Sequence, residues 1–126
     1  MTERLPTDRA ARRDLGVDLL ASLADEELDV ATAVDRVETV TTDPTLVREI
    51  LDTAERRGVI EREDGRVRVR RGGSLVRFES RVVERPVDAD CRRCGASLST
   101  GHFVRLEHGE LGPFGSSCVT KVTGRD

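Results

Sequence analysis

The sequence predicts an α+β fold in which a helical N-terminal part and a β-hairpin precede a small segment that contains all the cysteines. Apolar residues recur at helical spacing as far as Gly58. Over residues 59–70 they are followed by a strand-like pattern, in which valines alternate with charged residues. All three cysteines come after residue 90, and two of them form a C-x2-C pair. We therefore expect one domain over residues 1–85 and a second, smaller domain over residues 86–126.

The first two helices are predicted from their apolar stripes. The first helix lies between Thr7 and Leu23, where four leucines and an alanine recur at helical spacing. An acidic stretch follows, and Asp29 at its end can cap a second helix because aspartate accepts a bond from an unpaired amide. In that second helix Val30, Val34 and Val37 share one face.

The third helix has the clearest start and end signals. It starts at Asp43-Pro44, because the aspartate can cap it and the proline lacks the donor that would otherwise go unpaired. Gly58 supplies the left-handed residue that commonly ends a helix. The stripe between them falls at i, i+3, i+4 and i+7 and consists of Val47, Ile50, Leu51 and Ala54.

A two-stranded hairpin is predicted directly after this helix. Residues 59–63 and 66–70 flank Asp64-Gly65, a dipeptide that suits a tight hairpin turn. Val67 and Val69 alternate with arginines, so one face can pack on the helices while the guanidinium groups point to solvent. Residues 75–83 alternate weakly and indicate a further strand or a short helix, and residues 86–90 are expected to be a linker.

Three helices followed by a hairpin is the element order of winged helix-turn-helix domains. Residues 46–62 resemble the recognition helix and first wing strand of prokaryotic winged-helix regulators, in which a helix ends in glycine before an apolar strand. The resemblance covers roughly residues 8–71. It implies a domain that reads duplex DNA, although winged helices that bind only proteins share the pattern.

Six residues are candidates for DNA contact within this interpretation. Thr42, Thr45 and Arg48 lie where a recognition helix presents side chains to base edges. The hairpin residues Arg66, Arg68 and Arg70 suit phosphate groups. Two observations oppose this assignment. The hairpin arginines can instead balance the acids of the same strands, and the third helix carries Glu49, Asp52 and Glu55, which repel phosphate.

Composition gives no general support for a nucleic-acid partner. The chain has 126 residues and a net charge of −3, and only residues 61–85 have an excess of arginine over acid. Three phenylalanines, with no tryptophan or tyrosine, argue against binding of single strands by base stacking. No apolar run approaches a membrane span, and the charged first residues are unlike a signal peptide. We therefore expect a cytoplasmic protein.

The cysteine pattern predicts a zinc site. The sequence Cys-Arg-Arg-Cys-Gly at residues 91–95 places Cys91 and Cys94 on one tight turn, so both thiolates can face the same ion. Cys118 follows a glycine-rich turn and precedes a short apolar stretch that suits a helix capped by Ser116 or Ser117. An odd number of cysteines in a reducing compartment favours metal binding over disulfides. Another metal, or a metal-free set of redox-active or buried thiols, remains an alternative.

The same region resembles a treble-clef zinc finger, with a knuckle, a hairpin and a ligand on the first turn of a helix. It departs from that family because only one cysteine lies at the helix, so a fourth ligand is needed. His102 is the first candidate because it opens the strand that leaves the knuckle, whereas His108 lies near the hairpin tip. Water or a carboxylate such as Asp90 is the remaining alternative.

The chain as a whole is similar to an uncharacterised family of small haloarchaeal proteins. The resemblance rests on the sequences at residues 41–44, 91–95 and 112–118. Arginine outnumbers lysine 20 to 1, and the acidic, lysine-poor composition is also typical of a halophilic source. The family carries no activity that would transfer to this chain.

Together these observations predict a DNA-binding or transcription-associated winged-helix protein with a structural zinc ion. The alternative is a protein-interaction adaptor that uses the same fold without binding DNA. We do not expect the protein to be an enzyme. Both histidines fall in the cysteine-containing region, and no serine–histidine–aspartate set or carboxylate pair has the spacing that catalysis requires.

Overall fold

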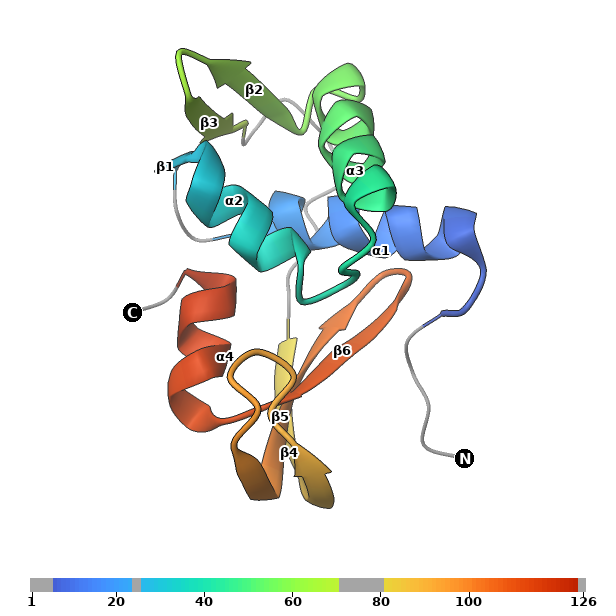
Figure 1. The fold of residues 1–126 in the computed structure, drawn as a ribbon, viewed down its shortest axis with the longest axis vertical. Helices are drawn as coiled ribbons and strands as arrows, with labels where there is room; N and C mark the ends of the chain where they lie inside the picture. The colour runs from blue at the N-terminus through green and yellow to red at the C-terminus, as the bar shows by residue number, and fades with distance from the viewer. Residues whose placement is uncertain (1–5, 24–25, 71–80, 125–126) are drawn as a thin grey trace.

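The computed structural model describes residues 6–23, 26–70 and 81–124, which form an α+β fold with two small antiparallel sheets (Figure 1). The helices are α1 (Arg9–Ser22), α2 (Val30–Val37), α3 (Pro44–Arg56) and α4 (Ser116–Thr123). The strands are β1 (Glu27–Asp29), β2 (Ile60–Glu63), β3 (Arg66–Val69), β4 (Arg81–Asp90), β5 (Ser97–Leu106) and β6 (Gly109–Phe114).

The predicted starts of α2 and α3 are confirmed, and α1 begins in the same way. The carboxylates of Asp8, Asp29 and Asp43 accept hydrogen bonds from backbone N–H groups in the first turns of α1, α2 and α3. Each bond satisfies a donor that has no partner within its helix. Gly58 follows α3 at a φ of 79°, as expected for a residue that ends a helix.

The first sheet contains the predicted hairpin and one strand that was not predicted. Its strand order is β1-β3-β2, and all pairs are antiparallel. Asp64 and Gly65 both have positive φ angles, as a tight turn that matches the strand twist requires. Val67 and Val69 are buried and the intervening arginines are exposed, which confirms the predicted alternation. The additional strand, β1, pairs Leu28 with Val67.

The second sheet has the order β4-β5-β6, and its first strand shows that one prediction was wrong. Residues 86–90 were expected to be a linker, but they form the second half of β4. Proline is tolerated there because β4 is an edge strand and the register shifts between Pro86 and Ala89. Of the weak pattern predicted over residues 75–83, residues 75–80 lie outside the described part of the chain.

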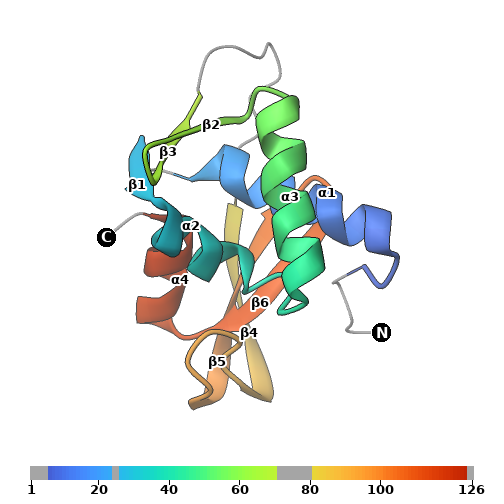
Figure 2. The same cartoon turned by 45° about the horizontal axis from the view of Figure 1, so that its top comes forward.

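Helix α1 lies between the two sheets. Figures 1 and 2 show α2, α3 and the β2–β3 hairpin on one side of α1, with the β4-β5-β6 sheet and α4 on the other. Gly16 of α1 permits a close approach to α3, because a Cβ atom built at this position would lie 2.6 Å from Cδ1 of Ile50.

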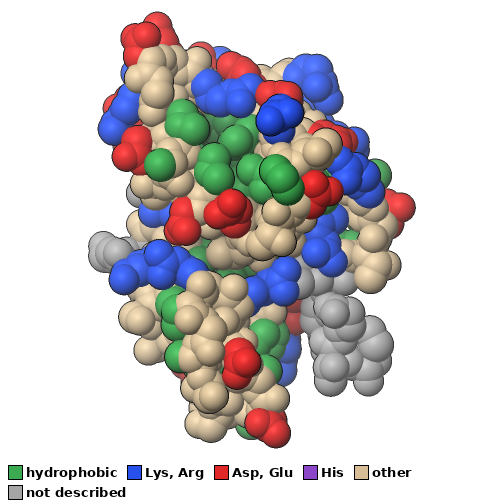
Figure 3. Space-filling view, in the orientation of Figure 1, with side chains coloured by type: hydrophobic (Ala, Val, Ile, Leu, Met, Phe, Trp, Pro, Cys, Tyr) green, Lys and Arg blue, Asp and Glu red, His purple; other side chains and the backbone are tan. Residues whose placement is uncertain are grey.

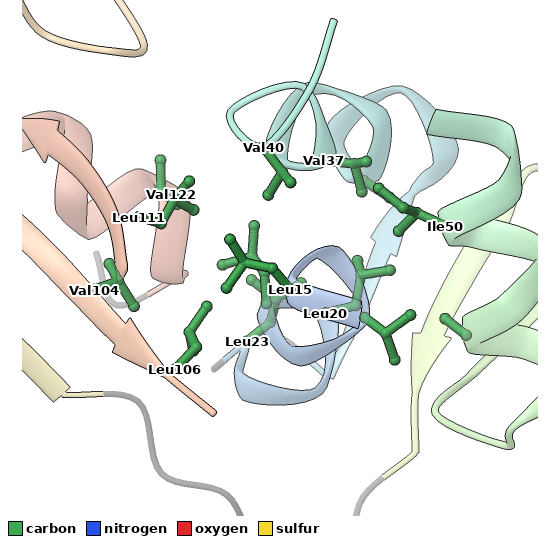
Figure 4. Close-up of a cluster of buried hydrophobic side chains, with 14 of the residues drawn as sticks. Leu15, Leu20, Leu23, Val37, Val40, Ile50, Val104, Leu106, Leu111 and Val122 are labelled. Atoms are coloured by element: carbon green, nitrogen blue, oxygen red, sulfur yellow. The ribbon is translucent and has the colours of Figure 1, made fainter. Parts of the chain in front are cut away.

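The buried hydrophobic side chains form one cluster that draws on both predicted segments. In Figure 4, Leu15 and Leu23 of the α1 region lie between Val37 and Ile50 on one side and residues of the C-terminal segment on the other. Those C-terminal residues are Val104, Leu106, Leu111 and Val122. Residues 1–85 and residues 86–126 therefore share a core.

Candidate functional site

Three thiols from two distant parts of the sequence meet at one point. Cys91 and Cys94 flank the turn between β4 and β5, and Cys118 lies in the first turn of α4. Their Sγ atoms all lie within 4.8 Å of one another. Cys91 and Cys118 are buried and Cys94 is exposed, so the group opens to solvent on one side. We call these residues the thiol group.

Backbone hydrogen bonds shape the turn that carries Cys91 and Cys94. The backbone N–H of Gly95 donates to the carbonyl of Cys91 at 2.9 Å, and the N–H of Cys91 donates to the carbonyl of Ala96 at 2.7 Å. Gly95 takes a φ of 82°, which an L side chain rarely adopts, so the glycine after the second cysteine closes the turn. Helix α4 starts at Ser116, and its N-cap residue is Gly115, which has no side chain to cap it, so the predicted cap by Ser116 or Ser117 was wrong.

The surroundings of the thiol group favour a thiolate at Cys91. Burial raises the pKa of Cys91, but hydrogen bonds from the backbone N–H groups of Cys94, Gly115 and Arg93 outweigh it and lower that pKa to about 6. The N–H of Gly115 lies 3.4 Å from its Sγ atom. Burial raises the pKa of Cys118, although Nη1 of Arg93 donates to its Sγ atom at 3.8 Å.

Three clustered thiols, one of them readily ionised, fit a thiophilic cation. Thiolate is the ligand that Zn²⁺ takes up in structural sites, at Zn–S distances of about 2.3 Å. The separation of the three Sγ atoms is therefore compatible with a metal site.

Neither histidine joins the thiol group. Nδ1 of His102 lies 3.3 Å from the carbonyl oxygen of Phe114, and its Nε2 lies 3.3 Å from a carboxylate oxygen of Glu84. His108 lies at the turn between β5 and β6, with Nδ1 2.7 Å from Oδ2 of Asp18 in α1. Asp90 is exposed and also lies outside the group. The structure thus brings together three of the four predicted metal ligands and places His102 elsewhere.

The predicted base-reading residues lie at and near the N-terminal end of α3. Thr42, Thr45 and Arg48 are all exposed. Thr45 and Arg48 line an open hollow of about 370 Å³, together with Glu49, Asp52 and, two turns further along the helix, Arg56. Sequence reasoning missed Arg56, although its i+8 spacing from Arg48 was a signal that both share one helix face.

The acidic residues of α3 are paired with arginines from other elements. Glu49 lies 3.0 Å from Arg9 and 3.6 Å from Arg13, both in α1. The guanidinium of Arg62 in β2 lies 2.6 Å from Asp52 and 2.7 Å from Glu55. Each carboxylate that was expected to repel phosphate therefore has a cation beside it.

The hairpin arginines are also paired, and this weakens their predicted role. Arg66 lies 3.5 Å from Glu27, and Arg68 and Arg70 lie 3.8 Å and 3.0 Å from Glu61. These groups are exposed, so each pair contributes little to stability. Their charges nevertheless offset one another, and the sheet face is not a strongly positive surface.

The chain matches the model of a family of unknown function (DUF5830) over residues 12–126. It belongs to this family. The DUF5830 match runs from α1 to the C-terminus, so it includes both sheets, α3 and the thiol group. No curated protein and no solved structure matches the chain significantly. Among the described residues, no helix has the length and apolar character needed to cross a membrane.

Proposed function

We propose that this chain binds double-stranded DNA through α3 and that Cys91, Cys94 and Cys118 hold a structural zinc ion. The element order α1-β1-α2-α3-β2-β3 and the sheet order β1-β3-β2 support a winged helix-turn-helix, with α3 as the recognition helix and β2–β3 as the wing. Helix α3 has 13 residues and is about 20 Å long, and a helix of this kind fits the major groove.

The observation that carries this proposal is the pairing of the α3 carboxylates. With its two capping residues and the groups paired with them, α3 gathers six arginines against five carboxylates. The arginines are Arg9, Arg13, Arg48, Arg56, Arg57 and Arg62, and the carboxylates are Asp14, Asp43, Glu49, Asp52 and Glu55. Glu49 and Asp52 line the same hollow as Arg48 and Arg56, but each has an arginine of another element beside it, so Arg48 and Arg56 are the cations that the hollow offers to DNA.

These side chains divide between the two kinds of contact that DNA binding requires. Arg48 suits the two hydrogen-bond acceptors on the edge of a guanine, because its guanidinium presents two parallel donors. The hydroxyl of Thr45 can form a hydrogen bond with a neighbouring base edge. Arg56 lies two turns away and suits a phosphate group. Sequence preference then depends on the first two residues and general affinity on the third.

The zinc ion would be held by three thiolates from the turn after β4 and the start of α4. This arrangement supports a treble-clef-like finger with one cysteine on its helix. The ion would supply a cross-link between these two segments, because both must keep their positions to share it. Its fourth ligand would come from solvent or from outside the described residues.

The composition supports a haloarchaeal cytoplasm as the setting. Concentrated salt screens charges within a few ångströms, so binding there must depend on hydrogen bonds to bases more than on phosphate attraction. An interface with few unpaired arginines, as on α3, suits this condition.

A titration of a fluorescent random duplex, followed by anisotropy at several salt concentrations, tests the proposal. We expect binding with a shallow dependence on salt, at a slope of about −1 in log K against log salt, because only the phosphate contact of Arg56 releases counterions. The absence of binding at low and at high salt would refute the proposal.

One observation favours the adaptor alternative. Figure 3 shows hydrophobic side chains gathered between the β2–β3 hairpin, α2 and α3, with charged side chains around them. Val30 and Val34 of α2, and Val59 directly before β2, are partly buried side chains that pack against the core. This second function would be supported if the chain binds no DNA and a protein partner protects the surface between the β2–β3 hairpin, α2 and α3 from proteolysis.

A further inference from the structure

The two residues between Cys91 and Cys94 are both arginines, and both extend from the thiol group to the region of α2. Nε of Arg92 donates to the carbonyl oxygen of Thr39 at 2.5 Å, and its Nη2 donates to that of Val40 at 3.2 Å. Both carbonyls belong to the turn between α2 and α3. A side chain of the cysteine turn therefore holds the connection that precedes the proposed recognition helix.

The carbonyls that Arg92 contacts need such a donor. Carbonyl groups at the end of a helix have no partner within it, and burial without a partner is costly. Thr39 and Val40 are 3% and 0% exposed, so water has little access to them. Arg12 of α1 also donates to the carbonyl of Val40, at 3.1 Å. Among the described residues, Thr39 has only Arg92 as a side-chain donor to its carbonyl.

Arg93 makes the second connection. Its Nη1 donates to Sγ of Cys118 at 3.8 Å, and its Nη2 lies 3.5 Å from Oδ2 of Asp35 in α2. One guanidinium thus joins a member of the thiol group to the helix that precedes the turn.

We propose that the thiol group is a metal-dependent control site for the turn between α2 and α3. An ion bound by Cys91 and Cys94 fixes the backbone between them, and with it the positions of Arg92 and Arg93. Loss of the ion frees this segment, so the carbonyl of Thr39 loses its side-chain donor, the carbonyl of Val40 keeps the bond from Arg12, and the turn loosens. The N-terminal part of α3, with Thr45 and Arg48, begins directly after that turn. The effect on DNA rests on the proposed function, whereas the effect on the turn does not.

Hydrogen exchange of the full chain tests this proposal. We expect removal of zinc by a chelator to speed exchange of the amides at residues 38–43 by about tenfold or more, and zinc-loaded Arg92→Ala to show fast exchange there while keeping its zinc. Arg105→Ala is the matched control, because this arginine pairs with Glu110 at 3.3 Å in the second sheet, and it should leave residues 38–43 unchanged.

Two results would overturn the proposal. The first is an unchanged rate of amide exchange at residues 38–43 in zinc-loaded Arg92→Ala. This result can be obtained even if the metal-free protein unfolds. The second is fast exchange after chelation that is confined to residues 91–96.

DNA affinity forms a separate arm of the experiment. Zinc-loaded Arg92→Ala should bind duplex about tenfold more weakly than the zinc-loaded wild type. If the wild type binds no DNA, the proposed function fails, and the exchange data alone decide whether the thiol group controls the turn.

Discussion

Asp18 and His108 form a doubly hydrogen-bonded pair that joins α1 to the turn between β5 and β6. Oδ2 of Asp18 lies 2.7 Å from Nδ1 of His108 and accepts the backbone N–H of the same residue at 2.9 Å. The aspartate is largely buried, whereas the side chain of His108 is 40% exposed. This contact ties the two parts of the chain together through the segment that separates Cys94 from Cys118.

The pair predicts a pH dependence of stability. The bond to Asp18 raises the pKa of His108, and burial raises the pKa of Asp18 despite the bonds from His108. A group with a raised pKa in the folded state stabilises it at low pH and loses that contribution as pH rises. We expect the free energy of unfolding to fall as pH rises above about 6.5, the ordinary pKa of histidine, by less than about 1 kcal/mol because solvent screens the exposed histidine.

Urea denaturation of wild type and His108→Asn across this range measures the effect. The asparagine keeps the backbone N–H bond and a side-chain donor but does not titrate. The difference in the free energy of unfolding between the two proteins should shrink as pH rises. A constant difference would show that the pKa of His108 does not change on folding.

The elements predicted from the sequence are those that local signals determine. Asp29, Asp43-Pro44 and Asp64-Gly65 act on their own neighbours, so helix starts and the hairpin turn could be read directly. Strand β1 could not, because the three residues Glu27–Asp29 are too few to show a strand pattern and become a strand only by pairing with β3. Residues 86–90 contain a proline and two acids, and only the neighbouring β5 makes them a strand.

The same division applies to the candidate sites. The C-x2-C spacing placed Cys91 and Cys94 on one turn, since both ligands lie on one short segment. The position of His102 depended on the register of β5 against β4 and β6, which directs its ring toward Glu84 and Phe114. Arg62 follows Asp52 and Glu55 in sequence, but its contact with them arises only because β2 packs against α3.

A methyl group at Gly16 should destabilise the contact between α1 and α3. Alanine favours a helix over glycine by about 1 kcal/mol, but its Cβ atom would lie 2.6 to 3.0 Å from three side-chain atoms of the fully buried Ile50. We expect a net loss of about 1 to 2 kcal/mol for Gly16→Ala. Ile50→Ala should cost less in that background than in the wild type, and additive effects in this double-mutant cycle would mean that the two residues do not meet.

Truncation in the shared core should affect both parts of the chain. Leu111 is fully buried in the cluster that also contains Leu15 and Leu23. We expect Leu111→Ala to lower the free energy of unfolding by about 2 to 5 kcal/mol and to lower amide protection in α1 as well as in β5 and β6. Loss of protection confined to residues 86–126 would instead show two independently stable domains.

The metal content should follow the thiol group and not the histidines. Purified wild type should contain about one zinc ion per chain, and Cys94→Ser should weaken zinc binding by more than about 100-fold, because a thiolate ligand is lost. His102→Ala should keep affinity within a few-fold, since its ring contacts Phe114 and Glu84. Elemental analysis and chelator competition measure this, and zinc loss in His102→Ala would mean that the ring turns to the metal.

The most direct measurement compares the DNA affinity of two matched sets of arginine variants. The double variant Arg48→Ala/Arg56→Ala removes the two arginines that line the hollow on α3. The double variant Arg68→Ala/Arg70→Ala removes two exposed arginines of the hairpin that are paired with Glu61. With zinc bound, anisotropy titrations of one duplex should show the first variant weakened by at least about 30-fold, in line with 1 to 3 kcal/mol for a bidentate base contact. The second should change less than about threefold. Equal weakening of both variants, or a larger loss in the second, would show that α3 is not the surface that binds DNA.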